Sequence, residues 1–169
     1  SQAEHDPMAS AILLTIDPTL AKQVQNEVNK QAKALPRKAI ITQSMQAFGA
    51  IMILETMEEC IDIANELAPE HLELMVEDSK QYLDQIRNAG SIFLGYMSCE
   101  AIGDYFGGTN HVLPTGGTAR FASALNVDSF TKKSSYLYWS EEALQKHGEK
   151  IIRIAQAEQL EGHANAVKV

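Results

Sequence analysis

The sequence predicts an α/β fold, with an incomplete parallel, Rossmann-like sheet, flanking helices and an extended, mostly helical C-terminal arm. Between residues 11 and 95, short apolar runs alternate with stretches of helical periodicity, which is typical of parallel α/β structure. After Gly95 this alternation stops: a glycine-rich loop covers 103–117, and beyond it a long amphipathic stretch follows an irregular segment. We therefore divide the chain into a partial α/β domain, 1–118, and a C-terminal arm, 119–169.

The first strand and helix are predicted from "AILLTI" and the residues that follow it. The apolar run at 11–16 predicts a strand, and Asp17 followed by Pro18 is a typical N-cap and first turn of a helix. Pro36 is expected to end this helix near Leu35.

Three more strands and two helices complete the predicted α/β part. "AIMILET", "HLELMV" and "GSIFLG" predict strands at 50–56, 71–76 and 90–95. Helical spacing of apolar residues predicts a helix over 57–67, and Ser79 is expected to cap another that reaches about residue 88.

The C-terminal arm follows a glycine-rich loop at 103–117. "SYLYW" at 135–139 is compatible with a short strand, and Ser140 is expected to cap a long helix from Glu141 to about Glu161. Because a one-sided apolar helix buries little on its own, we expect the arm to pack on a second copy of the chain.

Composition argues against several classes of partner. The formal net charge is −8, with 14 basic and 22 acidic residues and no long basic block, which disfavours nucleic acid and anionic membranes. The longest apolar runs are too short to span a bilayer and no charged leader precedes them, so we expect a soluble, cytoplasmic protein. The two cysteines lack CxxC spacing, which disfavours a disulfide framework or a cysteine metal site.

Two short segments near the start of the chain hold candidate ligands and catalytic groups. Gln2 and His5 are three residues apart, which suits two metal ligands on one helix face, although a solvated helix end explains the same spacing. Glu70 and His71 can act as base and acid from a loop, whereas on a strand they face opposite ways and a polar loop is an equal explanation.

Two further segments leave similar alternatives open. Asp104 is either a ligand or a cap and turn residue, and His111 in "GGTNHVLPTGG" can carry a proton or a ligand bond without any local proof of it. Glu158 and His163 share a site only if their helix ends near Gly162. Spacing alone therefore predicts an α/β protein with scattered candidate ligands.

Five motifs together resemble one known family. "APEHLEL", "NAGSIFLG", "AIGDY", "GTNHVLPTGGTARF" and "HANAV" occur here in the order of histidinol dehydrogenases. The resemblance covers essentially the whole chain and implies the last step of histidine biosynthesis, in which L-histidinol is oxidised through the aldehyde to L-histidine. Two NAD molecules are reduced in that reaction, and one water is consumed.

The resemblance also implies roles for individual residues. The family's zinc ligands match four residues: Gln2, His5, Asp104 and His163. Its substrate-binding residues match a larger set: Gln2, His5, His71, Asp104, His111, Glu158 and His163. Glu70 and His71 match the catalytic pair, in which the histidine takes the hydroxyl proton and the glutamate activates water.

The family context adds expectations about subunits and cofactors. In the family the arm reaches into the neighbouring subunit of a homodimer, so Glu158 and His163 are expected to serve the partner's site. Members are more than twice this length, and their NAD-binding region lies upstream of the part present here, so no NAD contact can be assigned to this chain. We therefore expect the chain alone to be inactive; a dimeric remnant without activity and a non-catalytic binding module are the alternative functions.

Overall fold

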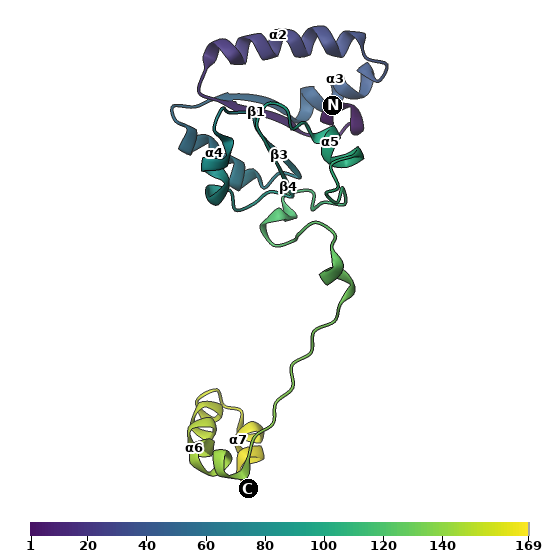
Figure 1. Ribbon diagram of the computed structural model, residues 1–169. Helices are drawn as coiled ribbons and strands as arrows, with labels where there is room; N and C mark the ends of the chain where they lie inside the picture. The colour runs from purple at the N-terminus through teal and green to yellow at the C-terminus, as the bar shows by residue number, and fades with distance from the viewer. Residues whose placement is uncertain (169) are drawn as a thin grey trace. The chain divides into compact units, whose positions relative to one another are not determined.

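The computed structural model describes residues 1–168 as two compact units, of which the first is Ser1–Ser129 and the second begins at Phe130 (Figure 1). Sequence patterning placed the division after residue 118, just beyond the glycine-rich loop that follows the alternating strands and helices. Within residues 1–168, no helix combines the length and apolar character that a membrane span requires.

The first unit opens with a parallel strand pair. Strand β1 (Ala11–Thr15) lies beside β2 (Gly49–Ile53) in parallel register, as the alternating pattern predicts. Parallel neighbours need a crossover connection. Here it consists of two helices, α2 (Pro18–Ala34) and α3 (Lys38–Phe48).

The start of α2 confirms the predicted cap. Asp17 accepts a hydrogen bond from the backbone N–H of Thr19 at 2.7 Å, and Pro18 stands at the first helical position. Helix α3 was not predicted from the sequence. Its N-cap residue, Arg37, is not one of the residue types that typically cap helices, and its side chain makes no capping hydrogen bond.

A second parallel pair consists of β3 (His71–Leu74) and β4 (Ser91–Leu94). The predicted helix α4 (Met57–Leu67) precedes it and begins with a capping box formed by Thr56 and Glu59. The expectation of one incomplete sheet is corrected: the strands form two separate two-stranded sheets, because no described strand bridges β1–β2 and β3–β4.

The connection between β3 and β4 also differs from the prediction. It is a 3-10 helix, η1 (Ser79–Gln85), and Ser79 is its first residue without a side-chain cap. The buried Asn65 explains why this helix ends early. Its carboxamide donates to the carbonyl of Gln85 at 2.9 Å and accepts from the backbone N–H of Arg87 at 2.7 Å, which satisfies the chain outside a helix.

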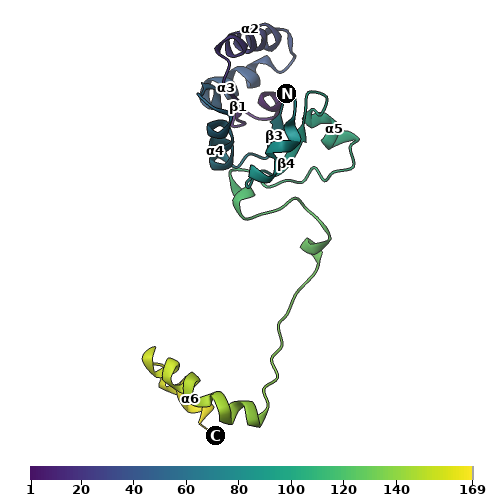
Figure 2. The same cartoon turned by 60° about the vertical axis from the view of Figure 1, so that its left-hand side comes forward.

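The rest of the first unit is mostly irregular. Its regular pieces are α5 (Glu100–Tyr105) and η2 (Thr118–Arg120), and a one-turn helix, α1 (Gln2–His5), opens the chain. A further 3-10 turn, η3 (Val127–Phe130), spans the boundary between the two units. Helices α4 and α5 lie on opposite sides of the β3–β4 pair (Figures 1 and 2).

The second unit is a pair of helices, α6 (Glu141–Ala157) and α7 (Glu161–Val167). Ser140 caps α6 as predicted, since its hydroxyl accepts the N–H of Ala143 at 3.1 Å. The predicted single helix is instead broken where Gln159 adopts a positive φ of 60°. The stretch 131–140 forms no strand, which corrects the expectation for "SYLYW": no described segment pairs with it.

Candidate active site

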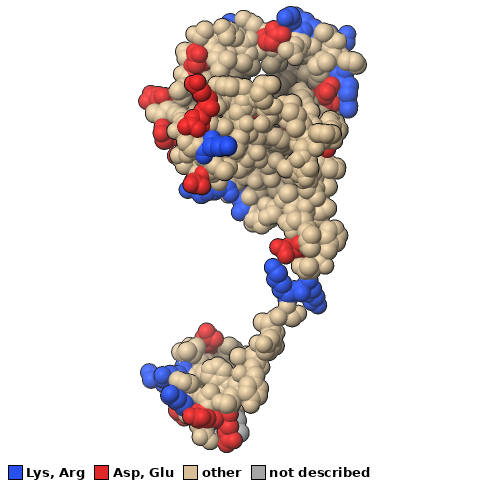
Figure 3. Space-filling model, in the orientation of Figure 1, with Lys and Arg blue, Asp and Glu red and all other residues tan. Residues whose placement is uncertain are grey.

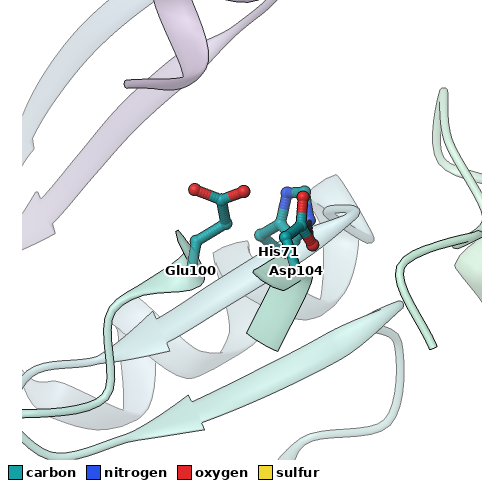
Figure 4. A group of neighbouring side chains, drawn as sticks. All are labelled: His71, Glu100 and Asp104. Carbon is teal, nitrogen blue, oxygen red and sulfur yellow. Dashed lines mark ion pairs between the residues drawn. The ribbon is translucent and has the colours of Figure 1, made fainter. Parts of the chain in front are cut away.

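The centre of the candidate site lies between β3 and α5. His71 begins β3, and its Nε2 lies 4.0 Å from Oδ1 of Asp104 on α5. Glu100 stands one turn before Asp104 on the same helix. One ligand atom from each of these three residues lies within 4.8 Å of the others (Figure 4).

The imidazole of His71 has spare bonding capacity. Both of its ring nitrogens are buried, and neither has a hydrogen-bond partner. Leaving a buried polar group unsatisfied costs about 1–3 kcal/mol. The ring also lies 6.0 Å from that of Phe93, so one of its neighbours is apolar. A histidine held in this way is suited to exchange a proton or to bind a ligand that the chain itself does not supply.

A side chain of strand β3 binds the first residue of α5. His71 and Glu73 alternate with Leu72 and therefore share one face of the strand. Oε1 of Glu73 accepts the backbone N–H of Glu100 at 2.9 Å, which satisfies a helix-terminal donor. This bond fixes where α5 begins relative to β3, and therefore where Asp104 lies beside His71.

Close packing of α5 on β4 depends on a glycine. A Cβ atom added to Gly103 would lie 2.7 Å from Cε1 of Phe93, well inside van der Waals contact. Because glycine has no such atom, α5 approaches the strands closely enough for Asp104 to face His71.

The N-terminal segment reaches the same region. Ser1 donates its hydroxyl to Oε2 of Glu100 at 3.3 Å, and Gln2 lines one open hollow together with Glu70, His71 and Glu100. Gln2 and His5 do lie on one helix, as their spacing suggests. The side chain of His5 is exposed, while its backbone carbonyl accepts a hydrogen bond from Arg37 at 3.3 Å.

Glu70 and His71 occupy different kinds of position. Glu70 precedes β3 and is half-buried, and its backbone carbonyl accepts the N–H of Ser91 at 2.9 Å. Glu70 lines the same hollow as His71, so the two residues contribute to one site from the start of the strand. Whether they act as the catalytic pair stays a prediction.

The glycine-rich loop is shaped by a neighbour of His111 and not by the histidine itself. Asn110 donates to the carbonyl of Leu125 at 2.7 Å and accepts the N–H of Val112 at 2.8 Å, while His111 is exposed. Gly117, with φ of 80°, adopts a left-handed conformation that other residues rarely take. A role of His111 in binding substrate stays a prediction.

The last two candidates belong to the second unit. Glu158 is the C-cap of α6, and His163 lies on α7, so the helix that was expected to run to about Glu161 is interrupted between them at Gln159. Both side chains are exposed. Their service to a partner subunit's site stays a prediction.

Two residues of the site, Glu100 and Glu73, were missed from sequence. Glu100 precedes the predicted Asp104 by four residues, which places both carboxylates on one face once "CEAIGDY" is recognised as a helix. Glu73 shares a strand face with His71 by the alternation of "HLEL". The signal for both was therefore present, but the expected loop at 103–117 concealed the helix.

Comparisons with known proteins agree on one family. The family model described as histidinol dehydrogenase matches residues 1–169. Histidinol dehydrogenases of Caldanaerobacter subterraneus and Listeria monocytogenes are 53% and 51% identical to the whole chain. The crystal structure of histidinol dehydrogenase from Elizabethkingia anophelis superimposes with a TM-score of 0.79 and 43% identity, covering 98% of this chain and 38% of that one. The chain spans 39% and 40% of the length of the two curated relatives.

Proposed function

The chain belongs to the histidinol dehydrogenase family, and on that premise we propose that it supplies the substrate- and metal-binding part of a zinc- and NAD-dependent histidinol dehydrogenase. The observation that carries this proposal is the His71–Asp104 pair, in which an imidazole with two unpartnered buried nitrogens faces a carboxylate. The substrate would be L-histidinol, oxidised in two steps through the aldehyde to L-histidine.

The donor set of the site fits a zinc ion. Gln2 brings an amide to the hollow, and Asp104 brings a carboxylate beside His71. Amide, carboxylate and imidazole groups together form a nitrogen and oxygen ligand set that zinc accepts. Gln2, His5 and Asp104 would hold the ion together with the partner's His163. When bound, zinc supplies Lewis-acid binding of substrate nitrogens, and NAD, for which this chain has no assigned site, supplies the hydride acceptor.

His71 and Glu70 divide the proton transfers between them. A ring nitrogen of His71 accepts the hydroxyl proton of the alcohol in the first oxidation. Asp104, 4.0 Å away, is placed to attract the positive charge that the ring then carries. Glu70 takes a proton from the water that adds to the aldehyde, and the resulting gem-diol is the species oxidised in the second step.

The second unit would complete the site from another subunit. Its buried core consists of Ile152, Ala155 and Ala164, packed against Val167, which is little for an independent body. Tyr136, Leu137 and Tyr138 expose between 83% and 96% of their surface. We infer that this arm packs on a second copy of the chain and brings Glu158 and His163 with it.

Calorimetry of this chain tests the proposed site without requiring turnover. Zinc should bind, and L-histidinol should bind only to the zinc-loaded chain, since the ion is expected to hold the substrate's nitrogens. Asp104→Asn should weaken zinc binding by about tenfold or more, because it removes the ligand charge. Histidinol binding that is equally tight without metal and in the Asp104→Asn variant would contradict the proposal.

A further inference from the structure

We propose that the hollow beside the candidate site is a docking surface for one further β-strand, which would join the pairs β1–β2 and β3–β4 into a single sheet. The strand belongs to the part of a histidinol dehydrogenase that this chain does not match. The inference rests on the family of the chain and is independent of the proposed metal site.

The hollow adjoins one strand of each pair. Strands β1 and β3 line it along their whole length, whereas β2 contributes only residues 49–51 and, within the described chain, β4 contributes none. Each strand pairs with a single neighbour, so β1 and β3 each keep an unpaired edge. Because their paired neighbours lie largely outside the lining, these open edges are the ones that adjoin the hollow. An open edge presents backbone N–H and C=O groups that can pair with a strand of another polypeptide.

Apolar side chains around the hollow are left uncovered. Parallel sheets in folded proteins are covered on both faces. Here Ile12 on β1, Leu20 on α2 and Met75 after β3 all line the hollow, and they are 38%, 42% and 50% exposed. Covering such surface with an apolar partner stabilises association through the hydrophobic effect. The hollow therefore offers apolar contacts as well as open strand edges.

The size of the hollow favours a polypeptide over a small ligand. Its volume is about 1860 Å³, whereas small-molecule sites usually measure about 300–1,000 Å³. The proposed substrate and zinc ion need only the end at Glu70 and His71, which leaves the part lined by β1 and α2 unfilled.

The unmatched part of the relatives is long enough to supply the strand. This chain covers 38% of the Elizabethkingia anophelis enzyme and 39% of the Caldanaerobacter subterraneus relative. Most of each of those polypeptides therefore lies outside the matched region, and the proposed occupant comes from there.

Refolding two polypeptides together tests the docking surface. The chain is refolded from urea with the unmatched part of the Caldanaerobacter subterraneus relative, in EDTA so that no zinc site contributes. We expect a complex of one copy of each polypeptide by light scattering. In that complex, hydrogen exchange measured by NMR should slow by about tenfold or more at those amides of β1 and β3 that do not bond to β2 or β4.

An aspartate in the hollow should oppose docking. Leu20→Asp places a carboxylate where the added strand would exclude water, and burial of an unpaired charge is costly. Its matched control is Leu83→Asp on η1, because Leu83 is 41% exposed and does not line the hollow. We expect Leu20→Asp to weaken the complex by about tenfold or more and Leu83→Asp to leave it unchanged. Thermal unfolding of each variant alone verifies that its fold is intact.

Three other results would overturn the inference. The first is the absence of a complex, or equal weakening by the two variants. The second is slow exchange at the same amides in the isolated chain, because a second copy would then already cover the edges. The third is protection of these amides by NAD alone, which would assign the hollow to the cofactor. A complex in EDTA supports the inference even if zinc titration contradicts the proposed metal site, and zinc binding without a complex supports only that site.

Discussion

Buried polar side chains in this protein have hydrogen-bond partners almost everywhere. The hydroxyl of Ser44, which is fully buried, donates to the carbonyl of Ala9 at 2.7 Å, and Asn65 satisfies both ends of its carboxamide. Among residues 1–168, the buried side-chain nitrogens and oxygens without a partner all belong to His71. A folded chain leaves few such groups, so their concentration in one residue favours a functional over a structural reading of His71.

Replacement of Asn65 by alanine should destabilise the first unit. The change leaves the carbonyl of Gln85 and the N–H groups of Arg87 and Asn88 without their partner, at a cost of about 2–4 kcal/mol in the free energy of unfolding. Urea unfolding measures it. Asn26→Ala, at an exposed position of α2, is the control and should change stability by less than about 0.5 kcal/mol. Equal effects of the two changes would show that the Asn65 bonds are not stabilising.

The two cysteines should differ in reactivity. Cys60 is buried in α4, and burial, followed by the negative charge of Glu59, raises the pKa of its thiol above the ordinary value. A raised pKa leaves less thiolate at about pH 8, and thiolate is the reactive form. A thiol reagent should therefore modify the exposed Cys99 first and reach Cys60 only on unfolding or at higher pH. Mass spectrometry of the labelled peptides measures both rates, and a Cys99→Ser variant should lose the fast phase.

At the level of helices and strands, Gly103 controls how closely α5 packs. Gly103→Ala should move α5 away from Phe93, since the new Cβ would lie 2.7 Å from the ring. We expect a loss of stability of about 1–3 kcal/mol and weaker zinc binding, because Asp104 moves with the helix. Gly162→Ala on α7 is the control, since nothing lies within 4 Å of its added Cβ. Unchanged zinc affinity in Gly103→Ala would show that the ligands tolerate a shift of α5.

The sequence predicted those elements that carry their own local signals. Asp17 with Pro18 marked the start of α2, and apolar spacing marked α4 with its observed bounds. Elements set by tertiary contacts were missed: η1 ends early because Asn65, from another helix, binds its last residues. The break at Gln159 carries no glycine or proline signal, so a continuous helix was expected there.

The residues of the candidate site also divide into those that short sequence motifs identified and those that tertiary contacts bring into the site. The motifs and their resemblance to a family named Glu70, His71 and Asp104, because these belong to short contiguous segments. The contribution of Glu100 depends on how α5 faces β3 across a separation of many residues, and no pattern within either segment encodes that distance. The family resemblance implied that His71 and Asp104 belong to one site. The structure adds that Nε2 of His71 lies 4.0 Å from Oδ1 of Asp104.

The first unit exposes uncharged and apolar surface. On the face shown in Figure 3, charged side chains lie mainly around the margins of the first unit and leave a broad central area without them. Several large apolar residues of β1 and β2 are also exposed, among them Ile12, Ile51 and Ile53. With 39% and 40% of the length of two relatives, the chain is not expected to contain all that histidinol oxidation requires.

Catalysis by this chain alone should therefore be absent. A pure sample with L-histidinol, NAD and zinc should give no NADH above the background of a His71→Ala variant, because no residue of the chain has been assigned to hold the nicotinamide against the alcohol carbon. Absorbance of NADH over time is the measurement. Steady production that His71→Ala abolishes would show that these 169 residues contain a complete active site.

Self-association should depend on the aromatic segment before α6. Tyr136, Leu137 and Tyr138 expose nearly all of their surface, and burying them against a second copy would stabilise a dimer through the hydrophobic effect. We expect a dimeric mass by light scattering at micromolar concentration and a monomeric mass when all three are changed to serine. The matched change of the exposed Gln23, Gln25 and Asn26 on α2 to serine should leave the dimer intact. Because the proposed metal site takes the partner's His163, the monomeric variant should also bind zinc more weakly than the control. An unchanged zinc affinity in a verified monomer would mean that a single chain supplies every ligand.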